Sequence, residues 1–214
     1  MHTIVVASQK GGAGKTTLAR NLAVAAAADE PFSVAVIDAD PQGTLTGWWD
    51  RREGIKPVLM PAFGGLDEVP ELLATFRDNG VRWTFIDTAP RDEAAVLALM
   101  GGADLVLVPV GASPDDLTAV DQTLQHCHRL RKPYLFVINR ARANTVLLRQ
   151  ARSELARHGP VATTVLYELE AFKHAAIGGY GATETDPGAA GRLVQRLLDE
   201  VRERLGAGAG EGSA

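Results

Sequence analysis

Cysteine is almost absent from this chain of 214 residues, because Cys127 is its single cysteine, and an internal disulfide is therefore excluded. Long apolar runs are absent as well, since none reaches the 18 residues that indicate a membrane-spanning helix. The first residues contain no charged segment followed by an apolar stretch and a cleavage site, so no secretory signal is expected. These absences favour a soluble protein of a reducing cytoplasm.

The composition is that of a globular protein, with 46% hydrophobic residues and a formal net charge of -4. A chain of this length can bury one sizeable core, so we predict a single domain over residues 1–205. The remaining residues, 206–214, read GAGAGEGSA. Glycine and alanine with one charge cannot offset the entropy of ordering, and we expect a disordered tail there.

Short apolar runs rich in β-branched residues alternate with longer helical stretches. The predicted strands cover residues 3–8, 33–38, 83–88, 104–110, 133–139 and 161–166. The predicted helices cover residues 15–28, 66–79, 92–101, 114–131, 144–158 and 193–205. This alternation predicts an α/β fold of the P-loop NTPase type, in which a doubly wound, mostly parallel sheet carries helices on both faces.

Polar residues gather where the predicted strands end. Lys10 and Lys15 follow the first strand, Asp38 and Asp40 lie at the end of the second, and Asp87 lies near the end of the third. In an open parallel sheet, ligands bind beyond the carboxyl ends of the strands. A binding site at that edge of the sheet is therefore expected.

The stretch from residue 8 to residue 17, SQKGGAGKTT, has the features of a phosphate-binding loop. Its glycines lie between a strand and a helix, where successive backbone N–H groups can converge on phosphate oxygens. Lys15 can reach the β and γ phosphates, and the Thr16 hydroxyl can ligate Mg²⁺. The fit to the standard pattern is imperfect, because Gln9 stands where that pattern has glycine. The residues predicted to hold the nucleotide here are Gly11, Gly12, Ala13, Gly14, Lys15, Thr16 and Thr17.

Three motifs together resemble the deviant Walker-A ATPases of the ParA/MinD family, and most closely the small ParA-type partition ATPases. They are KGGAGKTT at residues 10–17, IDADPQG at 37–43 and FIDTAP at 85–90, and they follow one another in the order of that family. The resemblance covers about residues 1–205. It implies an ATPase that binds ATP and Mg²⁺.

The resemblance also implies roles for individual residues. Lys10 corresponds to the signature lysine, which crosses a dimer interface to the nucleotide of the partner subunit. Asp40 corresponds to the residue that positions the attacking water, and Asp38 is expected to support the site. Asp87 resembles the Walker-B aspartate, which holds Mg²⁺ through a water. Asn139, in FVINR, corresponds to the position that contacts the adenine.

In such a family the ATPase acts as a switch, because the γ phosphate makes contacts that exist only in the dimer. The resemblance implies an ATP-dependent homodimer, non-specific DNA binding, and slow hydrolysis stimulated by a centromere-binding or cargo-adaptor protein. Candidates for the dimer face are Lys10, Gly12 and residues 109–116. The expected location is cytoplasmic, on the nucleoid in the ATP state, and the expected output is plasmid or chromosome partition.

Charge is unevenly distributed along the chain. Residues 1–125 hold 9 basic and 17 acidic residues, whereas residues 126–205 hold 13 basic and 8 acidic ones. A basic surface in the second half could contact phosphates without sequence preference. The candidates for DNA contact are Arg142, Arg149, Arg152, Lys173, Arg192 and Arg196.

The same motifs are compatible with other cellular functions. Relatives that position a protein cargo, or that assist conjugative transfer, share every motif above. A MinD-like membrane output is less favoured, because the last predicted helix carries Asp199, Glu200 and Glu203 and lacks aromatic residues. No segment before Thr3 is long enough for a helix-turn-helix, so specific operator binding is not expected.

Overall fold

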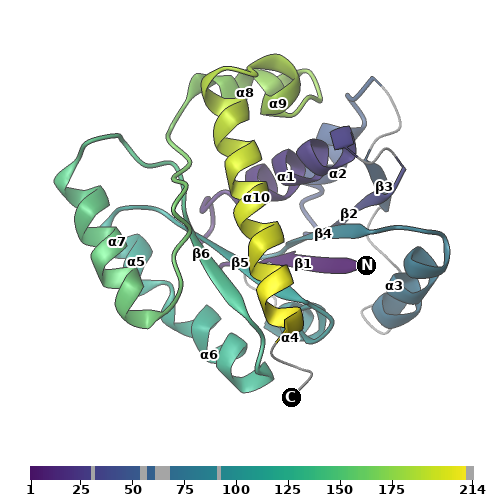
Figure 1. Cartoon of the computed structure of the whole chain (residues 1–214), viewed down its shortest axis with the longest axis horizontal. Helices are drawn as coiled ribbons and strands as arrows, with labels where there is room; N and C mark the ends of the chain where they lie inside the picture. Colours follow the sequence, from purple (N-terminus) through teal and green to yellow (C-terminus); the bar gives the residue numbers. More distant parts are fainter. Residues whose placement is uncertain (30–31, 54–56, 61–67, 91–92, 211–214) are drawn as a thin grey trace.

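The computed structural model describes residues 1–29, 32–53, 57–60, 68–90 and 93–210, and for Met60 and residues 207–210 only the backbone. Within these ranges six strands form one sheet in the order β3-β2-β4-β1-β5-β6, with every neighbouring pair parallel (Figure 1). The strands are β1 (His2–Val6), β2 (Val34–Ala39), β3 (Val58–Met60), β4 (Trp83–Thr88), β5 (Leu105–Val110) and β6 (Tyr134–Ile138). The predicted doubly wound α/β class is confirmed.

Five of the six predicted strands form, and β3 adds an edge strand that the sequence did not predict. The prediction of a strand over residues 161–166 was wrong, because no continuous ladder joins this segment to β6. The contacts are an isolated bridge at Val161, a hydrogen bond from the Leu166 N–H to the Ile138 carbonyl, and a second bridge at Tyr167, just beyond the segment. The cause lies in the middle of the segment. There the backbone N–H groups of Thr163 and Thr164 donate to the Glu200 carboxylate, at 2.6 and 2.8 Å, instead of to a neighbouring strand.

Helices connect the strands and cover both faces of the sheet. They are α1 (Lys15–Asp29), α2 (Thr44–Trp49), α3 (Val69–Asp78), α4 (Glu93–Gly101), α5 (Pro114–Thr118), α6 (Asp121–Leu130), α7 (Val146–His158), α8 (Glu170–Ile177), α9 (Ala182–Thr185) and α10 (Ala189–Gly210). The short helices α2, α8 and α9 were not predicted. Residues 66, 67 and 92 of the predicted helices lie outside the described residues.

The helix predicted over residues 114–131 is two helices. α5 begins with a capping box, in which Ser113 and Asp116 each bond the other's backbone N–H, and Pro114 occupies the first turn. α5 ends at Thr118 and α6 starts at Asp121. α6 then stops because Arg131 adopts a left-handed conformation with φ of 52°. The capping box fixes the position of the Asp116 carboxylate shortly after the end of β5.

Alternating strand residues divide the core into two clusters. On one face, side chains such as Ile4, Val36 and Phe85 pack with α1 and α10. On the other face, side chains such as Val5, Ile37 and Ile86 pack with α3, α4 and α6. A sheet buried on both faces explains why the strands read as continuous apolar runs.

α10 packs its apolar side against the sheet, and Figure 1 shows it in yellow lying across the strands. Its buried residues are Val194, Leu197, Leu198 and Val201. The Asp186 carboxylate accepts hydrogen bonds from backbone N–H groups at the start of this helix. The helix continues to Gly210, beyond residue 205 where the sequence predicted a tail, and residues 211–214 lie outside the described residues. No described helix has the length and hydropathy needed to cross a bilayer.

Candidate nucleotide site

The predicted phosphate loop lies between the end of β1 and the start of α1 and depends on glycine at two positions. Gly12 and Gly14 have φ angles of 76° and 93°, in the region that favours glycine. A Cβ at Gly14 would lie 2.1 Å from the Asn139 amide nitrogen, so no side chain fits there. The glycines therefore permit both the turn of the loop and the close approach of Asn139.

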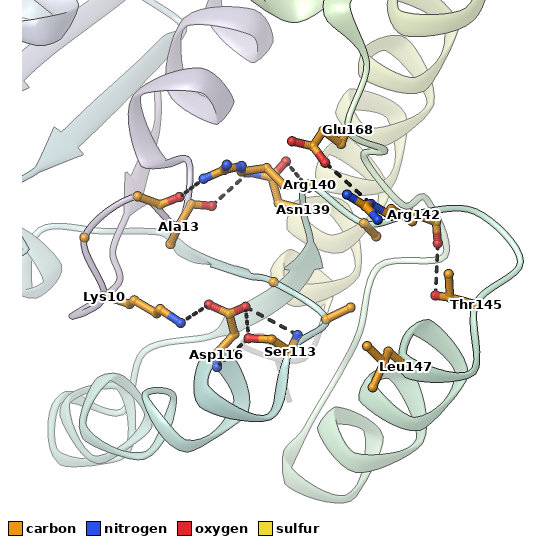
Figure 2. A pocket seen from close by; sticks show the side chains of 15 residues that line it. Lys10, Ala13, Ser113, Asp116, Asn139, Arg140, Arg142, Thr145, Leu147 and Glu168 are labelled. Carbon is orange, nitrogen blue, oxygen red and sulfur yellow. Dashed lines mark hydrogen bonds and ion pairs between the residues drawn. The ribbon is translucent and has the colours of Figure 1, made fainter.

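Two residues after β6 bond directly to the carbonyl groups of this loop. The Asn139 amide donates to the Ala13 carbonyl at 2.9 Å, and an Arg140 guanidinium N–H donates to the Gly12 carbonyl at 2.8 Å (Figure 2). Asn139 is buried, and its amide oxygen accepts from the Arg140 backbone N–H. In this structure Asn139 therefore holds the loop. The adenine contact expected of this residue remains a prediction.

Thr16 and Asp87 form the centre of the site. The Thr16 hydroxyl donates to the Asp87 carboxylate at 2.5 Å, across 71 residues of sequence. Asp87 is buried, and its other carboxylate oxygen has no hydrogen-bond partner among the described residues. Burial raises the pKa of Asp87 to about 7, against the Thr16 hydrogen bond and nearby Lys15, which lower it.

A divalent cation suits this arrangement. Mg²⁺ takes oxygen ligands and keeps several waters, so one hydroxyl and one carboxylate suffice as protein groups. The partnerless oxygen of Asp87 is a group that such an ion or its water would satisfy. Thr16 and Asp87 would be the groups that hold the ion, which would supply charge neutralisation for the phosphate oxygens, and this role remains a prediction.

Lys15 is buried beside this pair. Burial lowers its pKa, and the nearby Asp87 and Asp40 carboxylates oppose that effect. A lysine that is desolvated and close to two carboxylates can give its charge to a phosphate without first losing a hydration shell. The structure therefore brings Lys15, Asp40 and Asp87 together, as the sequence predicted.

Asp38, near the end of β2, and Asp40, just after it, have different surroundings. Asp38 is aligned with Asp87 across the β2–β4 pairing and is buried. Its carboxylate accepts from the backbone N–H and the hydroxyl of Thr46, at 2.7 and 2.9 Å, and so fixes α2. Asp40 is half-buried, and its carboxylate accepts from the backbone N–H of Gln42 and from no other group of the described residues. The Asp40 carboxylate thus has capacity to bind a water.

Lys10 lies away from the buried centre. Its ammonium group forms an ion pair of 2.6 Å with Asp116, and the two side chains are 36% and 19% exposed (Figure 2). Asp116 is held in turn by Ser113, whose hydroxyl donates to it at 2.5 Å. Burial acts to raise the pKa of Asp116, but the hydrogen bonds from Lys10 and Ser113 outweigh it and lower the pKa. The two lysines of the loop therefore have separate positions.

A cleft of about 470 Å³ opens beside Lys10. Lys10, Gly12, Ser113 and Asp116 line it together with Asn139–Arg142, Thr145, Leu147 and Glu168. The candidates for the dimer face, Lys10, Gly12 and part of the segment 109–116, thus border one surface. Leu147 and the neighbouring Val146 add exposed apolar area at its edge.

The predicted DNA-contact residues come from three parts of the structure. Arg142, Arg149 and Arg152 lie on or just before α7, Lys173 lies on α8, and Arg192 and Arg196 lie on α10. Three of these side chains have partners close to them in the structure. Arg142 pairs loosely with Glu168 at 3.9 Å and Lys173 pairs with Glu170 at 2.7 Å, while Arg152 donates to the Thr163 carbonyl. Among the described residues, Arg149, Arg192 and Arg196 are exposed without an ion pair. A single DNA-binding surface remains a prediction.

Three contacts of the candidate site were not predicted from the sequence. The bond from Thr46 to Asp38 depends on the unpredicted helix α2, and the bond from Arg140 to the loop depends on a left-handed residue with φ of 54°. The partner of Lys10 could have been found. The spacing Ser113-x-x-Asp116 with Pro114 after the serine is a capping-box pattern that places a carboxylate beside the end of β5.

Comparison with known proteins identifies the family of this chain. The sequence model of the CobQ/CobB/MinD/ParA nucleotide binding domain matches residues 4–179. The chain is 31% identical over 212 residues to the maintenance of carboxysome distribution protein A of Halothiobacillus neapolitanus, covering 93% of this chain and 95% of that protein.

Solved structures share the fold at lower identity. The MinC:MinD cell division protein complex of Aquifex aeolicus aligns with a TM-score of 0.79 and 18% identity, over 95% of this chain and 96% of that chain. The ATP complex of McdA from Cyanothece aligns with a TM-score of 0.69 and 22% identity, over 96% of each chain. With the phosphate loop, the buried Asp87 and the outlying Lys10 in place, this chain belongs to the CobQ/CobB/MinD/ParA family of nucleotide-binding proteins.

Proposed function

We propose that the protein is an ATPase switch that dimerises around ATP and Mg²⁺ and separates after hydrolysis. The observation that carries this proposal is the separation of the two loop lysines. Lys15 is buried beside Asp87, whereas Lys10 is part-exposed and bonded to Asp116. One lysine serves the nucleotide bound to its own loop, and the other is available to a second copy.

The residues divide the chemistry among them. Backbone N–H groups of the loop and Lys15 hold the phosphates, while Thr16 and Asp87 hold Mg²⁺. Asp40 orients the attacking water, because its carboxylate is close to Lys15 and accepts one local hydrogen bond among the described residues. Lys10 of the second copy then stabilises the negative charge that develops on the transferring phosphoryl group.

In the proposed dimer, Lys10 leaves Asp116 and binds the triphosphate held by the second copy. An ion pair as exposed as Lys10–Asp116 contributes about 1 kcal/mol or less to stability. Charge-assisted bonds from a lysine to a triphosphate in a site closed by two subunits are stronger. The ATP-bound second copy can therefore take Lys10 from Asp116, and loss of the γ phosphate lets it return.

Substituting Asp40 tests the assignment of the water-positioning residue. Asp40→Ala should retain ATP binding and ATP-dependent dimerisation but lose turnover, since Asp40 acts only on the water. Binding is measured by fluorescent-nucleotide titration, dimerisation by sedimentation velocity and turnover by phosphate release. An Asp40→Ala protein that still hydrolyses ATP at the wild-type rate contradicts the assignment.

The output we propose is movement of a cargo along DNA of the nucleoid, to which the ATP dimer binds without sequence preference. The basic excess of residues 126–205 supports it. Co-sedimentation with DNA in ADP, in ATP and in a slowly hydrolysed ATP analogue, across a salt series, tests this output. Equal affinity in all three nucleotide states would refute the switch, and absence of binding in all three would refute the DNA output.

The cargo is either DNA, as in plasmid or chromosome partition, or a protein assembly. The near full-length similarity to a maintenance of carboxysome distribution protein favours a protein assembly. A partner that stimulates hydrolysis is expected in both cases, and would be a centromere-binding protein in the first and a cargo adaptor in the second. Purifying the partner with the ATP-locked dimer distinguishes the two cases.

A membrane output is disfavoured by the packing of α10. Val194, Leu197, Leu198 and Val201 are buried against the sheet and are not free to enter a lipid surface. Flotation with anionic vesicles in ATP provides the control, and no lipid-bound fraction is expected.

A further inference from the structure

Arg20, on α1, is a buried arginine that the proposed chemistry does not use. The residue is 8% exposed, and its Nε has no hydrogen-bond partner among the described residues. The hydrogen bonds of its Nη2 are long, at 3.5 Å to the Thr17 hydroxyl and 3.4 Å to the Phe172 carbonyl. No carboxylate of the described residues forms an ion pair with it. A buried guanidinium with unsatisfied donors is costly to keep unless a ligand completes it.

Arg20 lines a small cavity next to the phosphate loop. The cavity has a volume of about 90 Å³, room for a few atoms of a ligand, and Arg20 shares it with Thr17 and Asn139. The remaining walls come from the segment before α8 and from α8 itself, namely Tyr167, Glu168, Leu169, Phe172 and Lys173, and from Arg140. The cavity therefore touches the loop at Thr17, where the predicted phosphate-binding run ends.

The order of the strands tells which end of a nucleotide faces this cavity. The loop follows β1, and Asp87 lies at the end of β4 on one side of it. Asn139 follows β6, on the other side of β1 and beyond β5. Because the γ phosphate lies with Lys15 and the Mg²⁺ residues Thr16 and Asp87, the nucleoside end points toward Asn139 and the Arg20 cavity.

We propose that Arg20 binds the nucleoside end of the nucleotide, donating from its guanidinium to a ribose hydroxyl or a purine ring nitrogen. This inference rests on the proposed function, since it needs a nucleotide in the phosphate loop. A guanidinium has only donors, so the group it recognises is an acceptor. Arg20 is thus a specificity residue that distinguishes a nucleoside triphosphate from a bare triphosphate.

The pKa of Arg20 is consistent with a buried guanidinium that has no ion-pair partner among the described residues. Burial lowers this pKa to about 10, a value at which the guanidinium is still charged near neutral pH. Asp87 opposes the effect of burial and Arg51 adds to it. The Arg20 guanidinium therefore stays charged in a desolvated environment, where a hydrogen bond to a ligand is stronger than in water.

The experiment compares binding of ATP and of inorganic triphosphate, each with Mg²⁺, to the wild type and to Arg20→Met by isothermal titration calorimetry. We expect ATP affinity to fall about tenfold or more, the loss of a charged hydrogen bond, while triphosphate affinity stays within about twofold. Arg204→Met, which removes an exposed arginine of α10 that lies outside the cavity lining, is the matched control and should leave ATP affinity within about twofold.

Other outcomes have definite meanings. Equal affinity of Arg20→Met and wild type for ATP overturns the inference, and so does an equal loss for ATP and triphosphate. A wild type that binds neither ligand refutes the proposed function itself. Thermal unfolding without ligand checks the fold, and Arg20→Met should be at least as stable as wild type there, because it removes a buried group with unmet donors. If it is unfolded, Arg20→Lys is titrated instead, with the same expected loss for ATP alone.

Discussion

At the scale of single residues, the site depends on one position where a side chain must be missing. Gly14 has a φ of 93°, and the Asn139 amide occupies the space where its Cβ would be. Asn139 in turn bonds the Ala13 carbonyl and so holds the loop. The conformation of the loop and the position of the Asn139 amide therefore share one condition, which is that residue 14 has no side chain.

Gly14→Ala tests this condition. The substitution adds a strained backbone and displaces Asn139, so the free energy of unfolding should fall by about 2 kcal/mol or more. Gly11→Ala is the control, because a Cβ at Gly11 meets nothing within 4 Å, and its effect should stay within about 0.5 kcal/mol. Urea unfolding measures both variants. Equal stability of the two would contradict the described packing.

Asp87 gives a residue-scale prediction about pH. Burial raises its pKa to about 7, well above its ordinary value near 4. In the protein without nucleotide or metal, the folded state therefore keeps a proton that the unfolded state loses, and stability falls as pH rises from about 4 to about 7. Asp87→Asn should remove this fall and be more stable than wild type at pH 8, by about 1 kcal/mol or more. Thermal unfolding between pH 5 and pH 8 measures the difference, and a wild type that gains stability over this range contradicts the prediction.

At the scale of elements, α10 is joined to the segment beside β6 by one carboxylate. Glu200 accepts hydrogen bonds from the backbone N–H groups and the hydroxyls of Thr163 and Thr164. Burial acts to raise the pKa of Glu200, but these hydrogen bonds outweigh it and lower the pKa. A side chain of the last helix thus takes the place of a neighbouring strand.

Glu200→Gln should lower the free energy of unfolding by about 1–2 kcal/mol at pH 7, since an amide accepts fewer and weaker hydrogen bonds. Because the pKa is lowered in the folded state, this stabilisation is present above the ordinary pKa of glutamate and is lost as pH falls. The difference from wild type should therefore shrink at pH 3. Glu203→Gln, an exposed change on the same helix, is the control. A Glu200→Gln effect that is independent of pH would refute the assigned cause.

The start of α5 is the second element with a functional consequence, because its capping box presents Asp116 to Lys10. Asp116→Asn keeps an acceptor for Ser113 but removes the charge that attracts Lys10. We expect this variant to dimerise at an ATP concentration lower by up to about fivefold, the range of an exposed ion pair. Asp121→Asn, an exposed change at the start of α6 and outside residues 109–116, should leave dimerisation unchanged. Weaker dimerisation of Asp116→Asn, followed by light scattering, would instead place Asp116 in the dimer contact.

At the scale of the whole molecule, the parts predicted from the sequence are those fixed by local patterns. Apolar runs and glycine-rich motifs gave the parallel sheet, the loop, and the grouping of Lys15, Asp40 and Asp87. The strand expected over residues 161–166 failed because its amides bond Glu200, about 36 residues away along the chain. The burial of Arg20 and the Arg140 bond to the loop likewise depend on tertiary contacts across more than 100 residues. Such contacts leave no periodic signal in the sequence.

The most direct measurement of the central claim mixes two inactive variants, Lys10→Ala and Asp40→Ala, and follows ATP hydrolysis. If Lys10 acts on the nucleotide of the other subunit and Asp40 acts on its own, as we propose, each mixed dimer has one complete site. Equal mixing should restore up to about a quarter of wild-type activity, because half of the dimers are mixed and one of their two sites is complete. If Lys10 acts within its own subunit, no mixed site is complete, and a mixture as inactive as each variant alone would contradict the account.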